Sequence, residues 1–326
     1  GRDILNGGSG DDTYIYNRGD GFDEITENGG NDKIVFGEGI AKTDLIFIQD
    51  GNNLKIQLNG NSEESITVKN HFNENNNYKI ERLEFADGTS IDLGSEELQL
   101  IHQTDLSETL SGNEYNNTLY GFGGNDTLNA GTGDDILDGG IGNDTLNGDL
   151  GNDKLTGGKG DDTLNGGAGD DIYYYNLGDG VDTINEAAGT DKIIFGEGIA
   201  SSDIKYRSVN EDLYLTIKGD ATQSIRLVNF FNASTNYRLE ALQFADGTII
   251  NISTTGLTYQ QQDVSETVNC LSWNDVINAG GGNDTINANG GDDIIYAEDG
   301  NDIVNAGEGN DTLVGGKGND LSLIHI

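Results

Sequence analysis

The chain has 326 residues, of which 57 are acidic and 17 are basic, so its formal net charge is −40. This charge argues against nucleic acid and anionic membrane surfaces as partners, because both are recognised by clustered lysine and arginine. The single cysteine excludes a disulfide scaffold, and no apolar run approaches the roughly 18 residues of a membrane span. A compact chain with this charge repels itself, so either the protein is unfolded or cations neutralise it.

The first predicted element, residues 1–35, is the end of an array of nine-residue repeats. Residues 7–15 read GGSGDDTYI, which fits the pattern G-G-x-G-x-D-x-U-x, where U is a large apolar residue or tyrosine. Asp3 and Asp12 are one repeat apart, whereas the step from Asp12 to Asp23 is two positions longer than a repeat. We therefore expect one degenerate coil after a two-residue insertion.

Residues 36–104 change to the alternation of ordinary antiparallel strands. Residues 45–48 and 54–58 flank an Asp-Gly turn, which indicates a hairpin, and residues 80–93 contain a second hairpin around an Ala-Asp-Gly-Thr turn. We expect a small β module whose apolar cluster covers the open end of the preceding array.

Residues 105–194 carry the most regular array, whose last coil is again degenerate. Its aspartates follow at steps of nine, each with glycine two residues before it and leucine or tyrosine two residues after it. These aspartates are Asp126, Asp135, Asp144, Asp153, Asp162 and Asp171.

The repeat dictates a shape. Its first six positions favour turns, because glycine adopts positive φ readily, and its last three form a strand with the U side chain facing inward. Two repeats make one coil, and successive coils stack into two parallel sheets. The sequence therefore predicts an all-β fold, a parallel β-roll interrupted by small antiparallel β modules.

Aspartates that are two repeats apart lie directly above one another in such a roll. One column contains Asp126, Asp144 and Asp162, and the other contains Asp135, Asp153 and Asp171. Carboxylates stacked about 5 Å apart repel, and a cation between successive turns reverses that repulsion. Calcium takes about six to eight oxygen ligands, whereas zinc and copper favour His or Cys, and magnesium keeps its waters. Solvated turns would also be rich in Asp and Gly, but they would not hold one acid in strict register.

Residues 195–262 form a second module, since 166–252 repeat 7–93 at a constant offset. Residues 263–320 form a third, truncated array, and residues 321–326, which place Ser322 where U belongs, are expected to be a non-native tail. The aspartates of the third array are Asp275, Asp284, Asp293, Asp302, Asp311 and Asp320. Four aspartate pairs, each one coil apart, in each of the two longer arrays predict about eight calcium ions or more.

The GGxGxDxUx arrays at 112–174 and 270–320 resemble the RTX (repeats-in-toxin) proteins, also called haemolysin-type calcium-binding repeats, and the modules resemble the haemolysin-type calcium-binding-related domain. The resemblance implies a β-roll with Ca²⁺ in its turns and export by type I secretion machinery. It also implies that the position-6 aspartates and the carbonyls of turn positions 1 and 3 bind the ion. Asn117 replaces the aspartate in the first repeat of the second array. The implied ligands are the aspartates above, Asp12, and the turn residues Gly121, Gly123, Gly139, Ile141, Gly148, Leu150, Gly157 and Lys159.

No catalytic constellation stands out, because the chain has no zinc-protease, esterase or P-loop motif.

We expect a non-enzymatic calcium-binding segment of a large secreted bacterial exoprotein, toxin- or adhesin-like, which folds on extracellular Ca²⁺. The alternative is a C-terminal accessory domain of a secreted protease, lipase or alginate epimerase whose catalytic domain lies outside this sequence. The expected partners are calcium ions and the secretion machinery, the expected location is extracellular or on the cell surface, and any host or polysaccharide ligand stays open.

Overall fold

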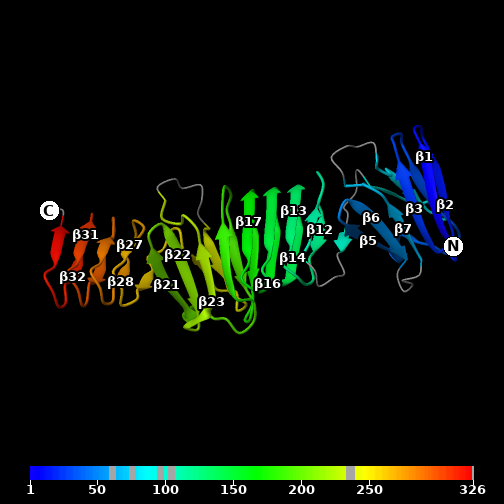
Figure 1. Ribbon diagram of the computed structural model, residues 1–326. Coiled ribbons are helices and arrows are strands. Elements are labelled where there is room, and N and C mark those ends of the chain that lie inside the picture. The colour runs from blue at the N-terminus through cyan, green and yellow to red at the C-terminus, as the bar shows by residue number, and fades with distance from the viewer. Residues whose placement is uncertain (59–63, 73–77, 94–98, 102–106, 233–238, 325–326) are drawn as a thin grey trace. The chain divides into compact units, whose positions relative to one another are not determined.

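The computed structural model describes residues 1–58, 64–72, 78–93, 99–101, 107–232 and 239–324 (Figure 1). Within these ranges the regular elements are β-strands and two three-residue 3₁₀ helices, Lys42–Asp44 and Ser201–Asp203. None of the described helices is long and apolar enough to cross a membrane. The chain forms two compact units, Gly1–Ile141 and Gly142–Ile326. The predicted start of the second array, at residue 105, and the end of the predicted tail lie outside the described residues.

The first unit begins with two stacked coils of the roll. Its strands are β1 (Arg2–Gly8), β2 (Thr13–Tyr16), β3 (Phe22–Glu27), β4 (Lys33–Phe36), β5 (Leu45–Asp50), β6 (Asn53–Leu58), β7 (Ser65–Val68), β8 (Arg82–Glu84), β9 (Ser90–Asp92), β10 (Gln99–Ile101), β11 (Thr109–Ser111), β12 (Thr118–Tyr120), β13 (Thr127–Thr132) and β14 (Ile136–Ile141). β1 pairs in parallel with β3, and β2 with β4. Thr13 pairs with Lys33 and not with Asn31, because the two-residue insertion lengthens this coil.

The module of the first unit continues the sheets of the second of these coils, β3 and β4. β5, β6 and β7 form an antiparallel meander, and β8 and β9 form the second hairpin that the sequence predicted. β7 also pairs in parallel with β3, and β8 with β4, which the sequence did not predict. The module therefore covers the end of the roll by adding strands to both of its sheets.

The second unit repeats this plan between two arrays. Its strands are β15 (Thr145–Leu150), β16 (Lys154–Lys159), β17 (Thr163–Ala168), β18 (Ile172–Tyr175), β19 (Val181–Asn185), β20 (Lys192–Phe195), β21 (Ile204–Val209), β22 (Asp212–Ile217), β23 (Asp220–Leu227), β24 (Ala241–Gln243), β25 (Ile249–Asn251), β26 (Thr258–Gln260), β27 (Thr267–Asn269), β28 (Val276–Asn278), β29 (Thr285–Asn287), β30 (Ile294–Tyr296), β31 (Ile303–Gly307), β32 (Thr312–Val314) and β33 (Leu321–Ile324). Figure 1 shows β27 to β33 stacked as successive coils.

The two sheets of the roll alternate along the chain, as predicted. β15 pairs in parallel with β17 and β16 with β18, and Thr145 stands opposite Thr163, its equivalent in the next coil. The U side chains fill the space between the sheets, and Leu146, Leu155 and Leu164 are at most 1% exposed. Burial of these side chains supplies the apolar core of the roll.

Strand length exceeds the expected three residues in most strands of the first two arrays. The strands β15, β16 and β17 each have six residues, whereas the pattern predicted three; most strands of the third array do have three. The pairing continues through repeat positions 2 and 3, where Asp149 stands opposite Gly167 and Leu150 opposite Ala168. Only positions 4 to 6 therefore turn, and position 2 is held within the strand at positive φ, 96° at Gly158.

Candidate metal centres

A ladder of hydrogen bonds fixes the position-6 aspartates. The backbone N–H of Asp144 donates to Oδ1 of Asp162 at 2.7 Å, and the N–H of Asp153 donates to Oδ1 of Asp171 at 2.8 Å. The same bond joins the pairs Asp275–Asp293, Asp284–Asp302, Asp293–Asp311 and Asp302–Asp320 in the third array. Each carboxylate is thereby turned toward the coil that precedes it in the chain.

The second oxygen of these carboxylates lacks a hydrogen-bond donor. Oδ2 is buried and accepts no hydrogen bond in Asp162, Asp171, Asp275, Asp284 and Asp293. Burying an anionic oxygen without a partner is costly, so such an atom requires a cation or a proton. No lysine or arginine forms an ion pair with these five aspartates in the described ranges of the chain.

The position-1 glycines leave space beside this oxygen. A Cβ atom built on Gly121 would lie 2.6 Å from Oδ2 of Asp126 and 2.5 Å from the carbonyl oxygen of Gly139. A carboxylate oxygen and a main-chain carbonyl of the next coil therefore face the same small space. Both are oxygen ligands of the kind that Ca²⁺ takes in proteins.

The position-3 carbonyls have a structural partner. The carbonyl oxygen of Lys159 accepts a hydrogen bond from the N–H of Gly142 at 2.8 Å, and that of Ile141 accepts one from Gly124 at 3.0 Å. A carbonyl oxygen has two lone pairs, so each of these groups keeps one for a further partner.

Burial disfavours the ionised form of the ladder. It raises the pKa of Asp162 and of Asp275 to about 7 and that of Asp182 to about 8, although the N–H donated to each Oδ1 works in the opposite direction. A divalent cation would restore the ionised form, because it supplies positive charge at the orphaned oxygen. The residues present therefore fit calcium as the occupant.

The calcium ligands that the sequence predicted do not all have the same surroundings. The structure places Asp135 as acceptor of the Asn117 N–H at 2.5 Å, and Asp12 donates its N–H to Oδ1 of Asp32 at 2.8 Å. Asp320 lies in the last coil and is exposed. At position 1 the third array carries buried alanines such as Ala279 in place of glycine.

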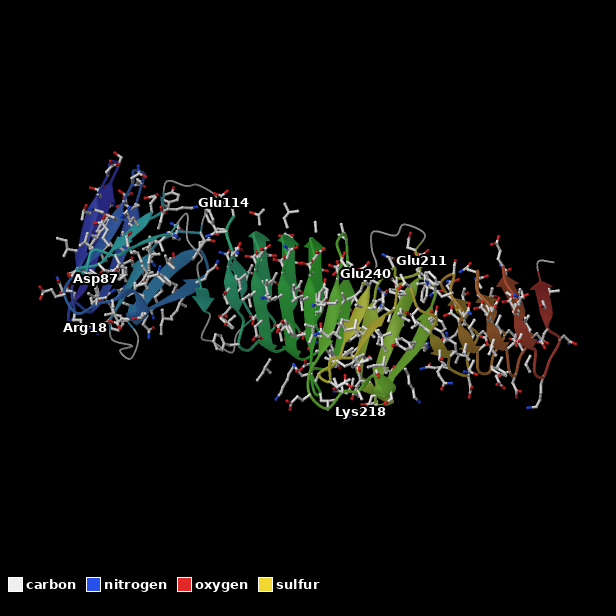
Figure 2. The ribbon with its side chains drawn as sticks, turned by 180° about the vertical axis from the view of Figure 1, so that it is seen from behind. Arg18, Asp87, Glu114, Glu211, Lys218 and Glu240 are labelled. Carbon is white, nitrogen blue, oxygen red and sulfur yellow. The ribbon has the colours of Figure 1, made fainter. Side chains whose placement is uncertain are left out.

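The sequence reasoning missed two contributors. Position 5 forms an outer ladder, in which the N–H of Asp161 donates to Oδ1 of Asn143 and the N–H of Asp170 to Oδ1 of Asn152. The signal was present, because position 5 is Asn or Asp in every repeat between residues 112 and 174. Each module also supplies an acid to the inner ladder: Oε2 of Glu240 accepts the Asp191 N–H at 2.7 Å, and Glu81 does the same for Asp32. Figure 2 labels Glu240.

Comparison with protein families finds two matches. The RTX calcium-binding nonapeptide repeat (4 copies) matches residues 1–23, 102–137, 120–155, 138–173, 147–184, 274–304 and 288–321. The haemolysin-type calcium binding protein related domain matches residues 53–94 and 212–254. Neither match indicates an enzymatic family.

No curated protein matches the chain. Among solved structures, the extracellular lipase LipA from Serratia marcescens matches with 19% identity and a TM-score of 0.25. The match covers 70% of this chain and 36% of the lipase, so the chain spans about a third of that protein's length.

Proposed function

The chain belongs to the RTX haemolysin-type calcium-binding repeat proteins, and from that premise we propose that it is the calcium-dependent folding segment of a secreted exoprotein. The segment is unfolded where calcium is scarce and becomes a β-roll in extracellular calcium. Its ions lie between successive coils, held by the position-6 aspartates and the turn carbonyls. The count we propose is about eight ions or more.

The observation that supports this proposal is the row of buried Oδ2 atoms without a donor, as in Asp162 and Asp284. Without a cation these atoms oppose folding, and the net charge of −40 adds repulsion along the chain. Because an ion binds the folded roll and not the separated strands, its binding free energy becomes folding free energy. Stability then rises with calcium concentration at each site, and linked sites make the transition cooperative.

Circular dichroism of the full chain tests the proposal. We expect a coil-like spectrum in excess chelator and a β-rich spectrum after addition of millimolar Ca²⁺, with no comparable change at the same concentration of Mg²⁺. A chain that is fully β-rich in excess chelator would contradict the proposal.

The proposal extends to export. A chain of this charge that stays unfolded in the calcium-poor cytosol is suited to passage through type I secretion machinery as an extended polypeptide. Folding outside the cell would then follow from the higher calcium concentration there. The segment would serve either a toxin- or adhesin-like exoprotein or a secreted enzyme, and the complete reading frame of its gene would distinguish these two.

A further inference from the structure

The degenerate coil carries a glutamate at position 1. Elsewhere in the second array this position is glycine or alanine, but Glu27 and Glu186 occupy it in the two copies of the coil. Both side chains are buried, with exposed fractions of 0% and 8%. An acid at this position places a carboxylate where the other coils offer only a main-chain carbonyl.

Each glutamate joins two ladder aspartates. Carboxylate oxygens of Asp171, Glu186 and Asp191 all lie within 4.8 Å of one another, and Asp12, Glu27 and Asp32 form the same cluster in the first unit. Oxygen ligands at about 2.3–2.6 Å from a calcium ion are at most about 5 Å apart. The spacing of each cluster therefore suits three ligands of one ion.

The hydrogen bonds within the cluster aim its oxygens without neutralising them. The Tyr173 hydroxyl donates to Oε1 of Glu186, and the Ala187 N–H donates to Oε2 at 3.2 Å. Asp171 is 0% exposed, and its buried Oδ2 accepts no hydrogen bond. An unpartnered, buried oxygen thus belongs to a group of three acids.

The first unit repeats this arrangement independently. The Tyr14 hydroxyl donates to Oε1 of Glu27, and Oδ2 of both Asp12 and Asp32 lacks a donor. A Cβ atom on Gly7 would lie 2.5 Å from Oε1 of Glu27 and 2.6 Å from Oδ2 of Asp12, so glycine is required to admit both carboxylates. Among the described residues, no lysine or arginine forms an ion pair with any acid of either cluster.

We propose that each cluster, Asp12–Glu27–Asp32 and Asp171–Glu186–Asp191, is a three-carboxylate calcium site that fastens the last coil of a roll to its module. The module takes part because Glu240 and Glu81 accept the N–H groups of Asp191 and Asp32. In each unit the proposed ion and the module therefore hold the same aspartate, which is Asp32 in the first unit and Asp191 in the second. This inference rests on the proposed calcium-dependent function of the arrays.

A proton is the competing occupant. Burial and the neighbouring Asp191 raise the pKa of Glu186 to about 9, so a cluster without an ion holds a proton near neutral pH. Replacing the glutamate by glutamine distinguishes a bound proton from a bound calcium ion. Glutamine replaces a protonated glutamate with little change, whereas it removes a charged ligand from an ion.

The test is the number of ions bound by the full chain, measured by equilibrium dialysis and elemental analysis at about pH 7.5. The double variant Glu27→Gln/Glu186→Gln should bind two fewer calcium ions per chain than the original protein. The matched control is Glu38→Gln/Glu197→Gln, because these exposed glutamates are also equivalent in the two modules; it should bind the original number. An unchanged count in the first variant would overturn the inference, whereas an original protein that binds no calcium would instead overturn the proposed function of the arrays.

A second measurement applies even where the glutamine variant fails to fold. Terbium bound at the clusters should emit when tyrosine is excited. Energy transfer requires a nearby tyrosine, and Tyr14 and Tyr173 form hydrogen bonds to the glutamates of the clusters. The variant Tyr14→Phe/Tyr173→Phe should lose a large part of this emission per bound ion, and Tyr296→Phe should lose less. Equal emission from the two variants would contradict the proposed sites.

Discussion

Two repeat positions need a left-handed backbone, and they tolerate side chains differently. Position 4 is glycine in almost every repeat, and Gly160 has a φ of 141°. Position 2 also has positive φ, but Asp149 and Glu298 occupy it as well as glycine. At both positions the glycine lies against the backbone of the preceding coil: a Cβ atom would be 2.6 Å from the carbonyl carbon of Gly142 at Gly160, and 2.8 Å from that of Asp149 at Gly167.

The first prediction concerns Gly160→Ala. A Cβ atom there would lie 2.6 Å from the carbonyl carbon of Gly142, which cannot move without shifting its coil. We expect the calcium-bound protein to lose ~2 kcal/mol or more of stability, measured by urea denaturation. The control Gly290→Ala, whose nearest contact is 3.5 Å, should lose far less, and equal losses would contradict the steric argument.

The second prediction concerns Glu298→Gly, which relieves strain at position 2. Glu298 has a φ of 68°, a conformation that costs a residue with a side chain ~1 kcal/mol. We expect the variant to gain up to about that amount in the free energy of unfolding, because the greater freedom of glycine in the unfolded chain offsets part of the relief. Glu308→Gly removes the same charge at position 3 of the next repeat, where φ is not left-handed, and should not be stabilising. Similar gains in both variants would identify charge as the cause.

At the scale of elements, each module ends the preceding array by adding strands that pair as those of a further coil would. β23 pairs in parallel with β19, and β24 with β20, so each sheet of the coil receives a further strand. Glu240 precedes β24 and continues the aspartate ladder by one step. Sheet edges and backbone N–H groups that the last coil would expose are thereby paired.

The third prediction tests this ending. Glu240→Ala removes the acceptor of a buried N–H, which costs ~1–3 kcal/mol. We expect a lower thermal midpoint in calcium and earlier hydrogen exchange at Asp191 and its neighbours in β20. Glu197→Ala, an exposed change in the same module, should leave both unchanged. Unaltered exchange at β20 in the Glu240 variant would show that the ladder does not depend on the module.

At the scale of the whole molecule, charge and burial oppose each other. The chain carries −40, yet its folded state buries carboxylates in every array. In the proposed function, calcium neutralises these carboxylates at neutral pH, and protons neutralise them in acid. The two ligands therefore compete for the same oxygen atoms.

The fourth prediction follows from the raised pKa values. The pKa of Asp162, Asp171 and Asp275 is raised from 3.8 to about 7 in the folded chain, chiefly by burial. The folded state thus holds protons more tightly than the unfolded chain, so their stabilising contribution is complete below about pH 4 and is lost as the pH rises to about 7. Calcium-free protein should be more β-rich at about pH 5 than at about pH 8 by circular dichroism. Equal spectra at the two values, or more structure at the higher one, would contradict the assignment.

The sequence by itself determined the all-β class, the two-repeat coil, the inward U side chains and the choice of calcium, because each depends on periodic local chemistry. The nine-residue spacing fixes which side chains share an edge, as in Asp144 and Asp162, and glycine fixes where the chain can turn. Only the tertiary structure decided that strands of the second array run through positions 1 to 3 and that the modules extend both sheets. The tertiary structure alone also placed Glu186 against Asp171. It likewise placed Glu240 against Asp191, although these two residues are far apart along the chain. Such contacts depend on how an irregular segment folds back on a regular one, and no repeat in the sequence records that path.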